Sequence, residues 1–278
     1  MQARFGPNIQ DESFHEDRNN QVYYKDSVRG ESVNYFLEVM GGFGAFQKVT
    51  TFNYFLSILG LSMFWMSFFF FELSPEFLCT KVDATGTKVT KQCTREQMCA
   101  TNDFTEYTVK DSYYSLVNWN QQVGIWCTTH AYVGLIGSFS FAGSAIACIF
   151  LPYLADNIGR QPVWQAVQFM HLPVFIAAIY APNLTMIFSV SFFMGMLLVG
   201  KMTVGYVFMI EMVPEQKQVM AGLLVMVGFP IAQILSTLIL IYSRETVNLL
   251  YVGFFFNAIT FCVCLAIPES PQWLVSQK

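Results

Sequence analysis

A carboxylate and a guanidinium stand four residues apart in a short polar turn between two long apolar runs. They are Asp156 and Arg160, and at this spacing two side chains meet on one face of a helical turn. Gly159 permits the tight bend between them, and Pro162 suits the first turn of a following helix. The pattern therefore predicts an ion pair at the connection between two helices.

Four of the seven cysteines gather in one polar segment, residues 72–128. Their chemistry is either disulfide formation or metal binding, and no histidine joins them at the spacing of a zinc finger. Clustering in an aqueous segment favours disulfides, so we predict at least one oxidised pair and no metal site. The sequence does not choose among the three pairings open to Cys79, Cys93, Cys99 and Cys127.

A lysine and a histidine lie inside apolar runs, where an ionisable side chain is costly. A lysine at the centre of a bilayer costs roughly 3 kcal/mol, so Lys201 should face a partner or water. No acidic residue occurs inside another predicted span, which favours a water-filled cleft or a lipid headgroup. A substrate-pathway lysine and a structural pairing both stay open. His171 stands alone in its run, and such a residue is more often hydrogen-bonded to a neighbouring helix than part of a proton relay.

Other chemistries lack their residues in this sequence. No nucleophile–base set, metal cluster or phosphate-binding loop occurs, so we predict neither an enzyme nor a cofactor, although bound lipid is expected. The net charge of −4 gives no reason to expect a nucleic-acid partner.

The elements that position these residues are membrane helices. The chain is 54% hydrophobic and 12% charged with a positive mean hydropathy, and several runs exceed the roughly 18 apolar residues that mark a membrane span. No short apolar stretch with a cleavage site opens the chain, so no cleavable signal peptide is expected. We predict six spans, at residues 49–71, 131–153, 163–180, 184–209, 219–242 and 247–267.

The remaining segments are extramembrane or interfacial. Residues 1–32 are polar and mixed in charge, which is typical of a solvated or partner-bound tail. Residues 33–48 have the amphipathic spacing of a segment that lies along the membrane surface. A large extramembrane loop, residues 72–128, follows the first span at 49–71. Residues 129–278 hold the other five spans and a Pro-Glu-Ser-Pro motif.

Three motifs resemble those of the major facilitator transporters, in their organic cation and anion branch. Residues 154–160 keep Leu-Ala-Asp and Gly-Arg of the Gly-x-Leu-Ala-Asp-x-x-Gly-Arg-Arg/Lys loop between helices two and three. Residues 41–47 resemble the Gly-x-Phe-Gly-Arg-Phe-Gln sequence before helix one. Residues 268–274 match six of seven positions of the Pro-Glu-Ser-Pro-Arg-Trp-Leu motif after helix six, which sugar transporters share. The residues expected to carry the transporter motifs are Asp156, Gly159, Arg160, Glu211, Pro268, Glu269, Ser270 and Pro271.

This resemblance implies an all-α membrane protein, the six-transmembrane-helix half of the major facilitator fold with a long cysteine-containing loop between helices one and two. It covers residues 33–278, the first half of a transporter. In the family, substrate binds near the mid-membrane between two six-helix halves, and access alternates as one half rocks against the other. One half alone supplies one wall of that pathway.

Several basic residues of the family pattern are replaced here. In relatives these bases, with the acids at Asp156, Glu211 and Glu269, form the cytoplasmic charge network that latches the two halves. A guanidinium holds a carboxylate by two charge-assisted bonds, and an amide cannot supply that charge. The replaced positions are Ala45, Asn157, Gln161, Ser191, Gln218 and Gln272.

Two functions follow from the resemblance. The first is a degenerate half-transporter that does not transport alone and is retained as a structural accessory subunit of a larger membrane complex, such as one of the respiratory chain. The alternative is an active transporter of organic cations or anions, formed by two such chains or with a separate C-terminal half. We favour the first because six bases are lost.

The first hypothesis has consequences for partners and location. Other membrane-protein subunits should cover the face of the missing half, where Asn53, Ser57, Gln233 and Lys201 would be costly to leave against lipid. The loop lacks Asn-x-Ser/Thr, and large energy-coupling complexes accumulate accessory helices. We therefore expect the mitochondrial inner membrane rather than the plasma membrane.

Overall fold

The computed structural model describes residues 42–82, 87–100, 106–110 and 115–277. The predicted polar tail at 1–32 lies outside these residues, as does most of the predicted amphipathic segment at 33–48.

Six helical spans in the described residues are long and apolar enough to cross a membrane, which confirms the predicted fold class of an integral multi-pass protein. Most begin and end within a few residues of the expected positions, and several extend into the polar turns that flank them. In chain order the spans are α2 (Ala45–Trp65) with α3 (Phe68–Glu72), α6 (His130–Ile158), α7 (Arg160–Ile179), α8 (Leu184–Val199) continued by the π-helical η2 (Gly200–Gly205) and α9 (Tyr206–Glu211), α10 (Glu215–Ser243) and α11 (Val247–Cys264).

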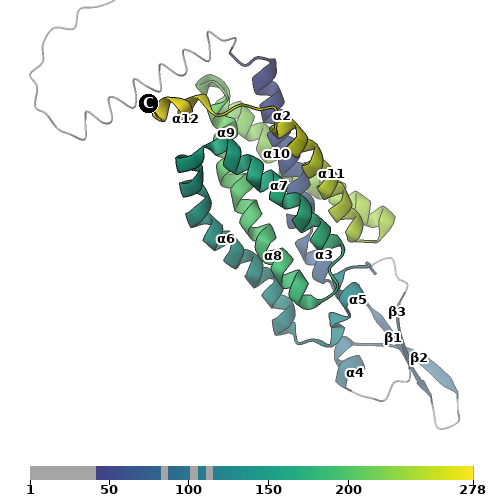
Figure 1. Ribbon diagram of the computed structural model, residues 1–278. Coiled ribbons are helices and arrows are strands. Elements are labelled where there is room, and N and C mark those ends of the chain that lie inside the picture. The colour runs from purple at the N-terminus through teal and green to yellow at the C-terminus, as the bar shows by residue number, and fades with distance from the viewer. Residues whose placement is uncertain (1–41, 83–86, 101–105, 111–114, 278) are drawn as a thin grey trace, which may run out of the picture.

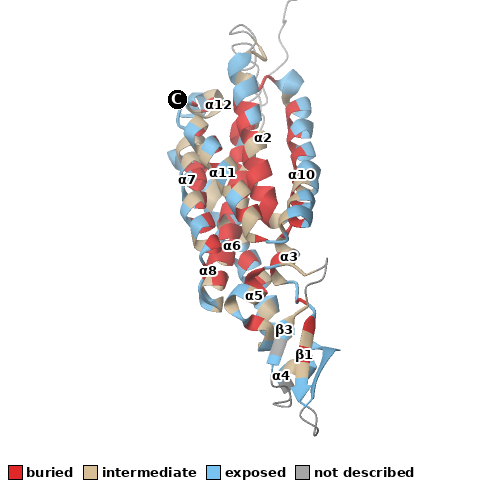
Figure 2. Ribbon diagram, turned by 90° about the vertical axis from the view of Figure 1, so that its right-hand side faces the viewer, coloured by how far each residue is buried: buried red, intermediate tan, exposed pale blue. Residues whose placement is uncertain are grey.

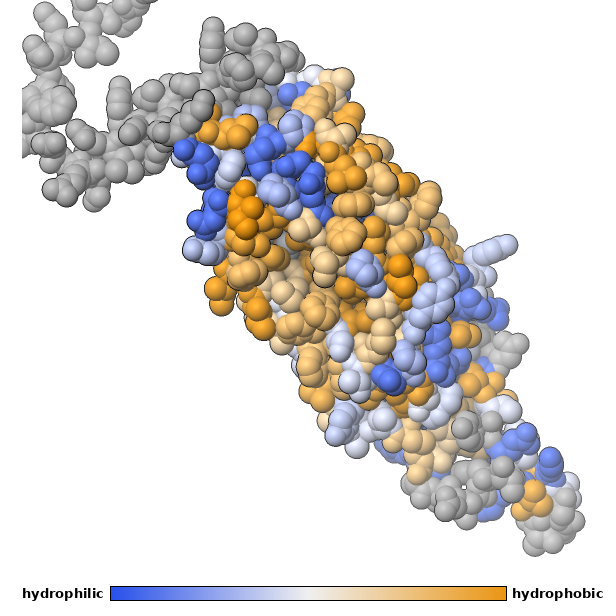
Figure 3. All heavy atoms as spheres, viewed as in Figure 1, coloured by the Kyte–Doolittle hydropathy of each residue, from blue (hydrophilic) through white to orange (hydrophobic). Residues whose placement is uncertain are grey.

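Helix α2 lies at the centre of the bundle, and Figure 2 shows buried residues along its length. It packs against α10 and α11, α6 packs against α8, and α7 joins the two groups through contacts with α11 and α8. The outer faces of α6 and α10 carry most of the exposed apolar side chains of the spans. Figure 3 shows hydrophobic residues over the body of the bundle and hydrophilic residues toward its ends, as a bilayer requires.

Helices α6 and α8 cross at backbone distance. A Cβ atom on Gly143 would run into the carbonyl group of Phe192, and one on Gly195 would run into the carbonyl group of Ser140. The Ser144 hydroxyl donates a hydrogen bond of 3.0 Å across this crossing to the Gly195 carbonyl oxygen. Small residues at this crossing therefore allow the two helix backbones to approach closely.

The loop after the first span contains a three-stranded antiparallel sheet, which the sequence did not predict. Its strand order is β2 (Lys88–Cys93), β1 (Phe77–Val82), β3 (Glu106–Val109). The short helix α4 (Arg95–Ala100) lies between β2 and β3 in the chain, and α5 (Trp119–Val123) and η1 (Ile125–Cys127) follow β3. Figure 1 shows the sheet at one end of the bundle. The final helix α12 (Pro271–Ser276) and the beginning of α2 lie at the other end.

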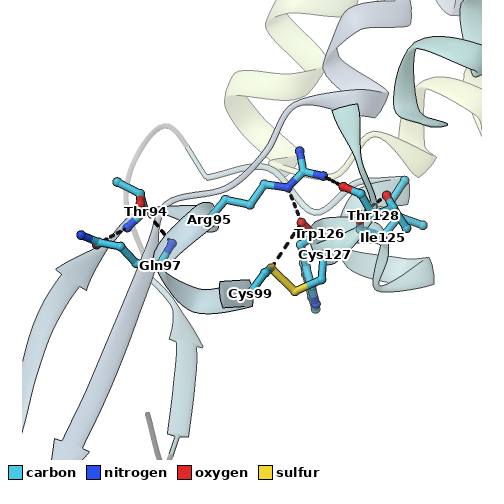
Figure 4. Close-up of a disulfide and its surroundings, with 8 residues drawn as sticks. All are labelled: Thr94, Arg95, Gln97, Cys99, Ile125, Trp126, Cys127 and Thr128. Atoms are coloured by element: carbon cyan, nitrogen blue, oxygen red, sulfur yellow. Dashed lines mark hydrogen bonds between the residues drawn. A yellow bond between two sulfur atoms is a disulfide. The ribbon is translucent and has the colours of Figure 1, made fainter. Parts of the chain in front are cut away.

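Two disulfides cross-link this extramembrane region, joining Cys79 to Cys93 and Cys99 to Cys127. The first ties β1 to β2 at a Cα separation of 5.8 Å, and the second ties α4 to η1 at 5.4 Å. The Arg95 guanidinium reinforces the second link by donating to the carbonyl oxygens of Trp126 and Thr128, as Figure 4 shows. The predicted oxidation is confirmed, and the fold selects one of the three possible pairings.

The segment that leads from the sheet region into α5 is fixed to the bundle. The Val117 backbone exchanges hydrogen bonds of 2.9 Å with the turn between α10 and α11, accepting from the Thr246 amide and donating to the Arg244 carbonyl. The Asn118 side chain donates to the Phe70 and Leu73 carbonyl oxygens, and the fully buried Trp119 indole donates to the Ala178 carbonyl. The end of the first span, α7 and the turn between α10 and α11 therefore hold residues 117–119.

Peptide mapping without reductant should recover Cys79 linked to Cys93 and Cys99 linked to Cys127, while Cys148, Cys262 and Cys264 react with alkylating agent after denaturation. Loops of 14 and 28 residues closed in this way stabilise by about 3 to 4 kcal/mol each in the chain-entropy account. Replacing Cys99 and Cys127 together by serine should therefore make the sheet region the first site of limited proteolysis. Complete alkylation of all seven cysteines in unreduced protein would contradict the pairing.

Candidate functional site

The connection between α6 and α7 is much shorter than the polar turn that the sequence predicted. Helix α6 continues through Pro152 and Asp156 to Ile158, and α7 begins at Arg160, so Gly159 alone lies between the helices. It adopts φ +123°, and a Cβ there would run into a Glu269 carboxylate oxygen and come within 3.2 Å of the Pro162 ring. Glycine is favoured because an L side chain at this backbone conformation would be strained.

The predicted ion pair forms, and its strongest partner comes from another helix. Arg160 Nη2 lies 3.5 Å from Asp156 Oδ1, while Arg160 Nη1 donates to Glu211 Oε1 at the end of α9. Glu211 is buried, and its second oxygen accepts a 2.6 Å hydrogen bond from the Ser270 hydroxyl. Asp156 is the outer member, with a side chain 68% exposed.

The Pro-Glu-Ser-Pro motif closes the same cluster from the end of α11. Glu269 Oε1 accepts hydrogen bonds from the backbone amides of Gln161, at 3.0 Å, and Ser270, at 2.8 Å. Pro268 is exposed and follows the buried Ile267, and Pro271 opens α12 behind the Ser270 cap. Segments 156–161, 211 and 267–273 therefore meet at one end of the bundle, which we call the charge cluster: Asp156, Arg160, Glu211, Glu269 and Ser270.

Amide side chains at three replaced positions bind carbonyl groups of this chain. Gln161 Nε2 donates to the Ile267 carbonyl at 2.8 Å, and Gln218 Nε2 donates to the Ile210 and Val213 carbonyls at 3.3 and 3.2 Å. Asn157 Nδ2 donates to the Tyr153 carbonyl at 2.8 Å. These amides stabilise helix ends where the family pattern places a base.

Lys201 is fully buried among the helices of this chain, which agrees with the structural pairing that the sequence left open rather than with the favoured cleft or lipid headgroup. Its ammonium donates to Asn257 Oδ1 on α11, and its own carbonyl oxygen accepts a 2.8 Å hydrogen bond from the Tyr54 hydroxyl on α2. Lys201 lies in the π-helical turn η2, an irregularity that is often found at functional sites. Asn257 was missed by the sequence analysis, although an asparagine in an apolar run is a signal of the same kind as the lysine.

Other polar residues expected on an exposed face also lie inside the bundle. Asn53 Nδ2 donates to the Thr260 carbonyl at 3.3 Å, and the Ser57 hydroxyl accepts a 2.8 Å hydrogen bond from Gln168. Gln233 alone of the four expected residues is partly exposed. The expectation was wrong for Asn53, Ser57 and Lys201, because α7 and α11 cover that side of α2 and η2.

His171 is buried in α7, and its Nδ1 lies 3.2 Å from the Val167 carbonyl oxygen one turn earlier in the same helix. Its Nε2 has no hydrogen-bond partner within the described residues. The neighbouring-helix bond expected for a lone membrane histidine is thus replaced by a bond within its own helix. Nor do the described segments bring three His, Cys, Asp or Glu side chains together as a metal ion would need.

Lys201→Met should lower the free energy of unfolding by about 1 to 3 kcal/mol, because the buried Asn257 amide oxygen would lose its donor. The double variant Lys201→Met/Asn257→Leu should recover most of that loss, since two apolar groups of similar shape replace the pair. Thermal unfolding of the three proteins in detergent measures both effects. A single variant as stable as the unaltered chain would mean that this bond contributes nothing.

Comparison with known proteins gives one family and a set of partial relatives. The sugar (and other) transporter family matches residues 90–278. A "Solute carrier family 22 member 15-like" protein of Xenopus tropicalis is 29% identical over 245 residues, 85% of this chain and 46% of the relative. A protein of the same description from Xenopus laevis is 31% identical over 150 residues, 52% of this chain and 30% of the relative. The "Niacin transporter NiaP" of Acinetobacter baylyi is 33% identical over 89 residues, 32% of this chain and 20% of the relative. The chain spans less than half the length of each of these relatives.

Proposed function

Because this chain belongs to the sugar (and other) transporter family, as an organic cation/anion transporter-like member of the major facilitators, we propose that it forms the first six-helix wall of a pathway for small organic ions. The observation that carries the proposal is the charge cluster, in which three motif segments far apart in the sequence meet around the buried Glu211.

The proposed role of the cluster is that of a latch at one end of the pathway. Arg160 holds Glu211 within this chain, while the Asp156 carboxylate beside it is largely exposed. Because Asp156 is exposed while its neighbours are fixed, its carboxylate can form an ion pair with a basic side chain of the second six-helix half and break it again. A contact worth about 1.4 kcal/mol changes the ratio of two conformations tenfold, so one such pair is enough to bias which end is open.

The substrate class follows from the relatives and not from a pocket in this chain. Their names describe solute carriers and a niacin transporter, which favours small ionised organic molecules. Lys201 is buried among the helices of this chain. In this conformation it would affect a substrate only indirectly, by fixing the position of η2 against α11.

The accessory-subunit hypothesis remains a second candidate, and one observation favours it. Gln161, Gln218 and Asn157 replace basic residues of the family pattern, and their amides bind carbonyl groups of this chain. Fewer cations therefore remain to form reversible ion pairs with a second six-helix half. Asn53, Ser57 and Lys201, however, are buried by this chain itself, so they do not need a neighbouring subunit to cover them. Retention in a stable complex, such as one of the mitochondrial inner membrane, is therefore the weaker proposal.

Uptake by the protein in its native form separates the two proposals. The protein is extracted from its own membrane with mild detergent, sized, and reconstituted into liposomes with a panel of organic carboxylates and quaternary ammonium ions. Saturable uptake of at least one ion, with competition inside its charge class, is the expected result. Absence of uptake across the panel, together with migration at fixed stoichiometry in a larger particle, would favour the accessory role instead.

A further inference from the structure

The fourth span contains one turn that is not an α-helix. Between α8 and α9, the six residues of η2 (Gly200–Gly205) form a π-helix, in which each carbonyl bonds an amide five residues later rather than four. A hydrogen-bonded π turn therefore holds one residue more than an α turn. Such turns are rare and mostly occur singly inside α-helices, so the contacts around η2 should explain why the extra residue is kept.

Two hydroxyl groups bind carbonyl oxygens of this turn. The Tyr54 hydroxyl on α2 donates a hydrogen bond of 2.8 Å to the Lys201 carbonyl oxygen. The Val199 carbonyl, whose partner in an α-helix is the Thr203 amide, accepts a hydrogen bond of 2.7 Å from the Thr203 hydroxyl. Where a π turn returns to an α-helix, two carbonyls compete for one amide, so one of them needs another donor. Tyr54 and Thr203 supply additional donors to this irregular backbone.

The end of η2 packs closely against α2 and α7. Tyr54 is 1% exposed, and its ring centroid lies 6.3 Å from that of Trp164 and 6.4 Å from that of Tyr206. A Cβ atom on Gly205 would come within 2.7 Å of the Trp164 indole nitrogen and 2.9 Å of the Tyr54 ring. A neighbouring residue of the helix could not take the place of Gly205 without moving these rings. The Tyr54 hydroxyl therefore acts on a turn whose rotation is set by close packing.

The rotation of α9 decides which of its residues reaches the charge cluster. Helix α9 runs from Tyr206 to Glu211, and Figure 1 shows it at the end of the bundle that holds α12. If η2 became α-helical with no residue removed, α9 would turn by about 100°, and a side-chain atom about 5 Å from the helix axis would move by about 8 Å. A hydrogen bond spans only about 3 Å, so Glu211 would leave both Arg160 and Ser270.

We propose that Tyr54 and Thr203 are positioning residues for the charge cluster. By keeping the extra residue in η2, their hydroxyls fix the rotation of α9 at which Glu211 meets Arg160. A buried turn of the fourth span thus controls contacts at one end of the bundle. This inference deepens the proposed latch and rests on the proposed function for its effect on uptake. Its test measures the contact between Arg160 and Glu211 directly, so the result does not depend on transport.

A double-mutant cycle reports whether Arg160 and Glu211 remain in contact. Arg160→Gln and Glu211→Gln, singly and together, are made in the unaltered chain and in a Tyr54→Phe/Thr203→Val background, and melting temperatures are measured in detergent. The two changes should be non-additive in the unaltered chain, and this non-additivity should fall by at least about half in the background without the hydroxyls. A role in general stability alone would lower the melting temperatures and leave the non-additivity unchanged, which would overturn the proposal.

Tyr242→Phe/Thr237→Val is the matched control background. It removes the same two hydroxyls from α10, where Thr237 donates a hydrogen bond of 2.8 Å to the Gln233 carbonyl four residues earlier and Tyr242 is 93% exposed. The non-additivity between positions 160 and 211 should be the same as in the unaltered chain. An equal loss in the two backgrounds would mean that η2 has no special role.

Deletion of Met202 tests the extra residue itself. Met202 lies inside η2, and its removal leaves the number of residues that an α turn needs, so α9 should keep its present rotation. The deletion should therefore restore the non-additivity in the Tyr54→Phe/Thr203→Val background. Deletion of Phe188 is the control, because α8 has no extra residue there and the shortened chain should not fold. A chain without Met202 that fails to fold, or that lacks the non-additivity, would overturn the proposal.

Discussion

Replacing Arg160 with glutamine should lower organic-ion uptake at least about tenfold and reduce the free energy of unfolding by about 3 kcal/mol. Glu211 is buried and holds Arg160 through one oxygen and the Ser270 hydroxyl through the other. Without the guanidinium, a buried carboxylate keeps only a neutral donor. Breaking a buried pair from one side is costly because the remaining charge is left uncompensated.

The double variant Arg160→Gln/Glu211→Gln separates stability from transport. It removes both charges, so thermal stability should return close to that of the unaltered protein, with a coupling of about 1 to 3 kcal/mol between the two sites. Uptake should stay low, because Asp156 would lose the Arg160 guanidinium that lies beside it in the charge cluster. Recovery of full uptake in the stable double variant would show that the cluster is structural only.

Lys217→Gln is the matched control for loss of a cation at this end of the bundle. Lys217 is exposed in the first turn of α10 and lies outside the charge cluster. Its replacement should change stability by no more than about 0.5 kcal/mol and leave uptake intact. Equal effects of the Arg160 and Lys217 variants would point to net charge rather than to the contacts of Arg160.

Gly195→Ala is expected to destabilise the bundle by about 3 kcal/mol or more, although it adds one carbon atom. The new Cβ would meet the carbonyl group of Ser140 on α6, and backbone atoms cannot rotate away as a side chain can. The two helices would have to separate, which would also weaken the bond from Ser144 to the Gly195 carbonyl. Yield of monodisperse protein and melting temperature in detergent measure this loss.

The same substitution elsewhere on α6 supplies the control. A Cβ on Gly134 would meet nothing within 4 Å, so Gly134→Ala should be neutral or stabilise by up to about 1 kcal/mol through helix propensity. A Gly195→Ala protein with the melting temperature of the Gly134→Ala protein would contradict the close crossing of α6 and α8.

The local part of the candidate site was predictable from the sequence. The pair Asp156 and Arg160 depends on a spacing of four within one helical turn, and Gly159 and Pro162 act on their own backbone positions. Such features involve residues close together in the chain, so they do not depend on how the helices pack against one another. The extent of the turn was predicted wrongly, because a polar sequence at a helix end can remain helical when other segments satisfy its side chains.

The longer-range partners could not be obtained in this way. Arg160 meets Glu211 and Lys201 meets Asn257 across 51 and 56 residues. One residue turns a helix by about 100°, so a small change in helix rotation would exchange these partners for others. The same uncertainty explains why Asn53 and Ser57 were expected on an exposed face and are buried.

The sequence by itself determined a six-span membrane protein, its motif positions and the oxidation of cysteines in its first loop, because these follow from composition, run length and local spacing. Only the tertiary structure decided which cysteines pair, because the sheet brings Cys79 beside Cys93 and the contact of α4 with η1 brings Cys99 beside Cys127. It also decided that Lys201 lies inside the bundle and that the span from Leu184 to Glu211 contains a π-helical turn. Both depend on how helix faces rotate and cross, which the backbone contact of Gly143 and Gly195 fixes for α6 and α8.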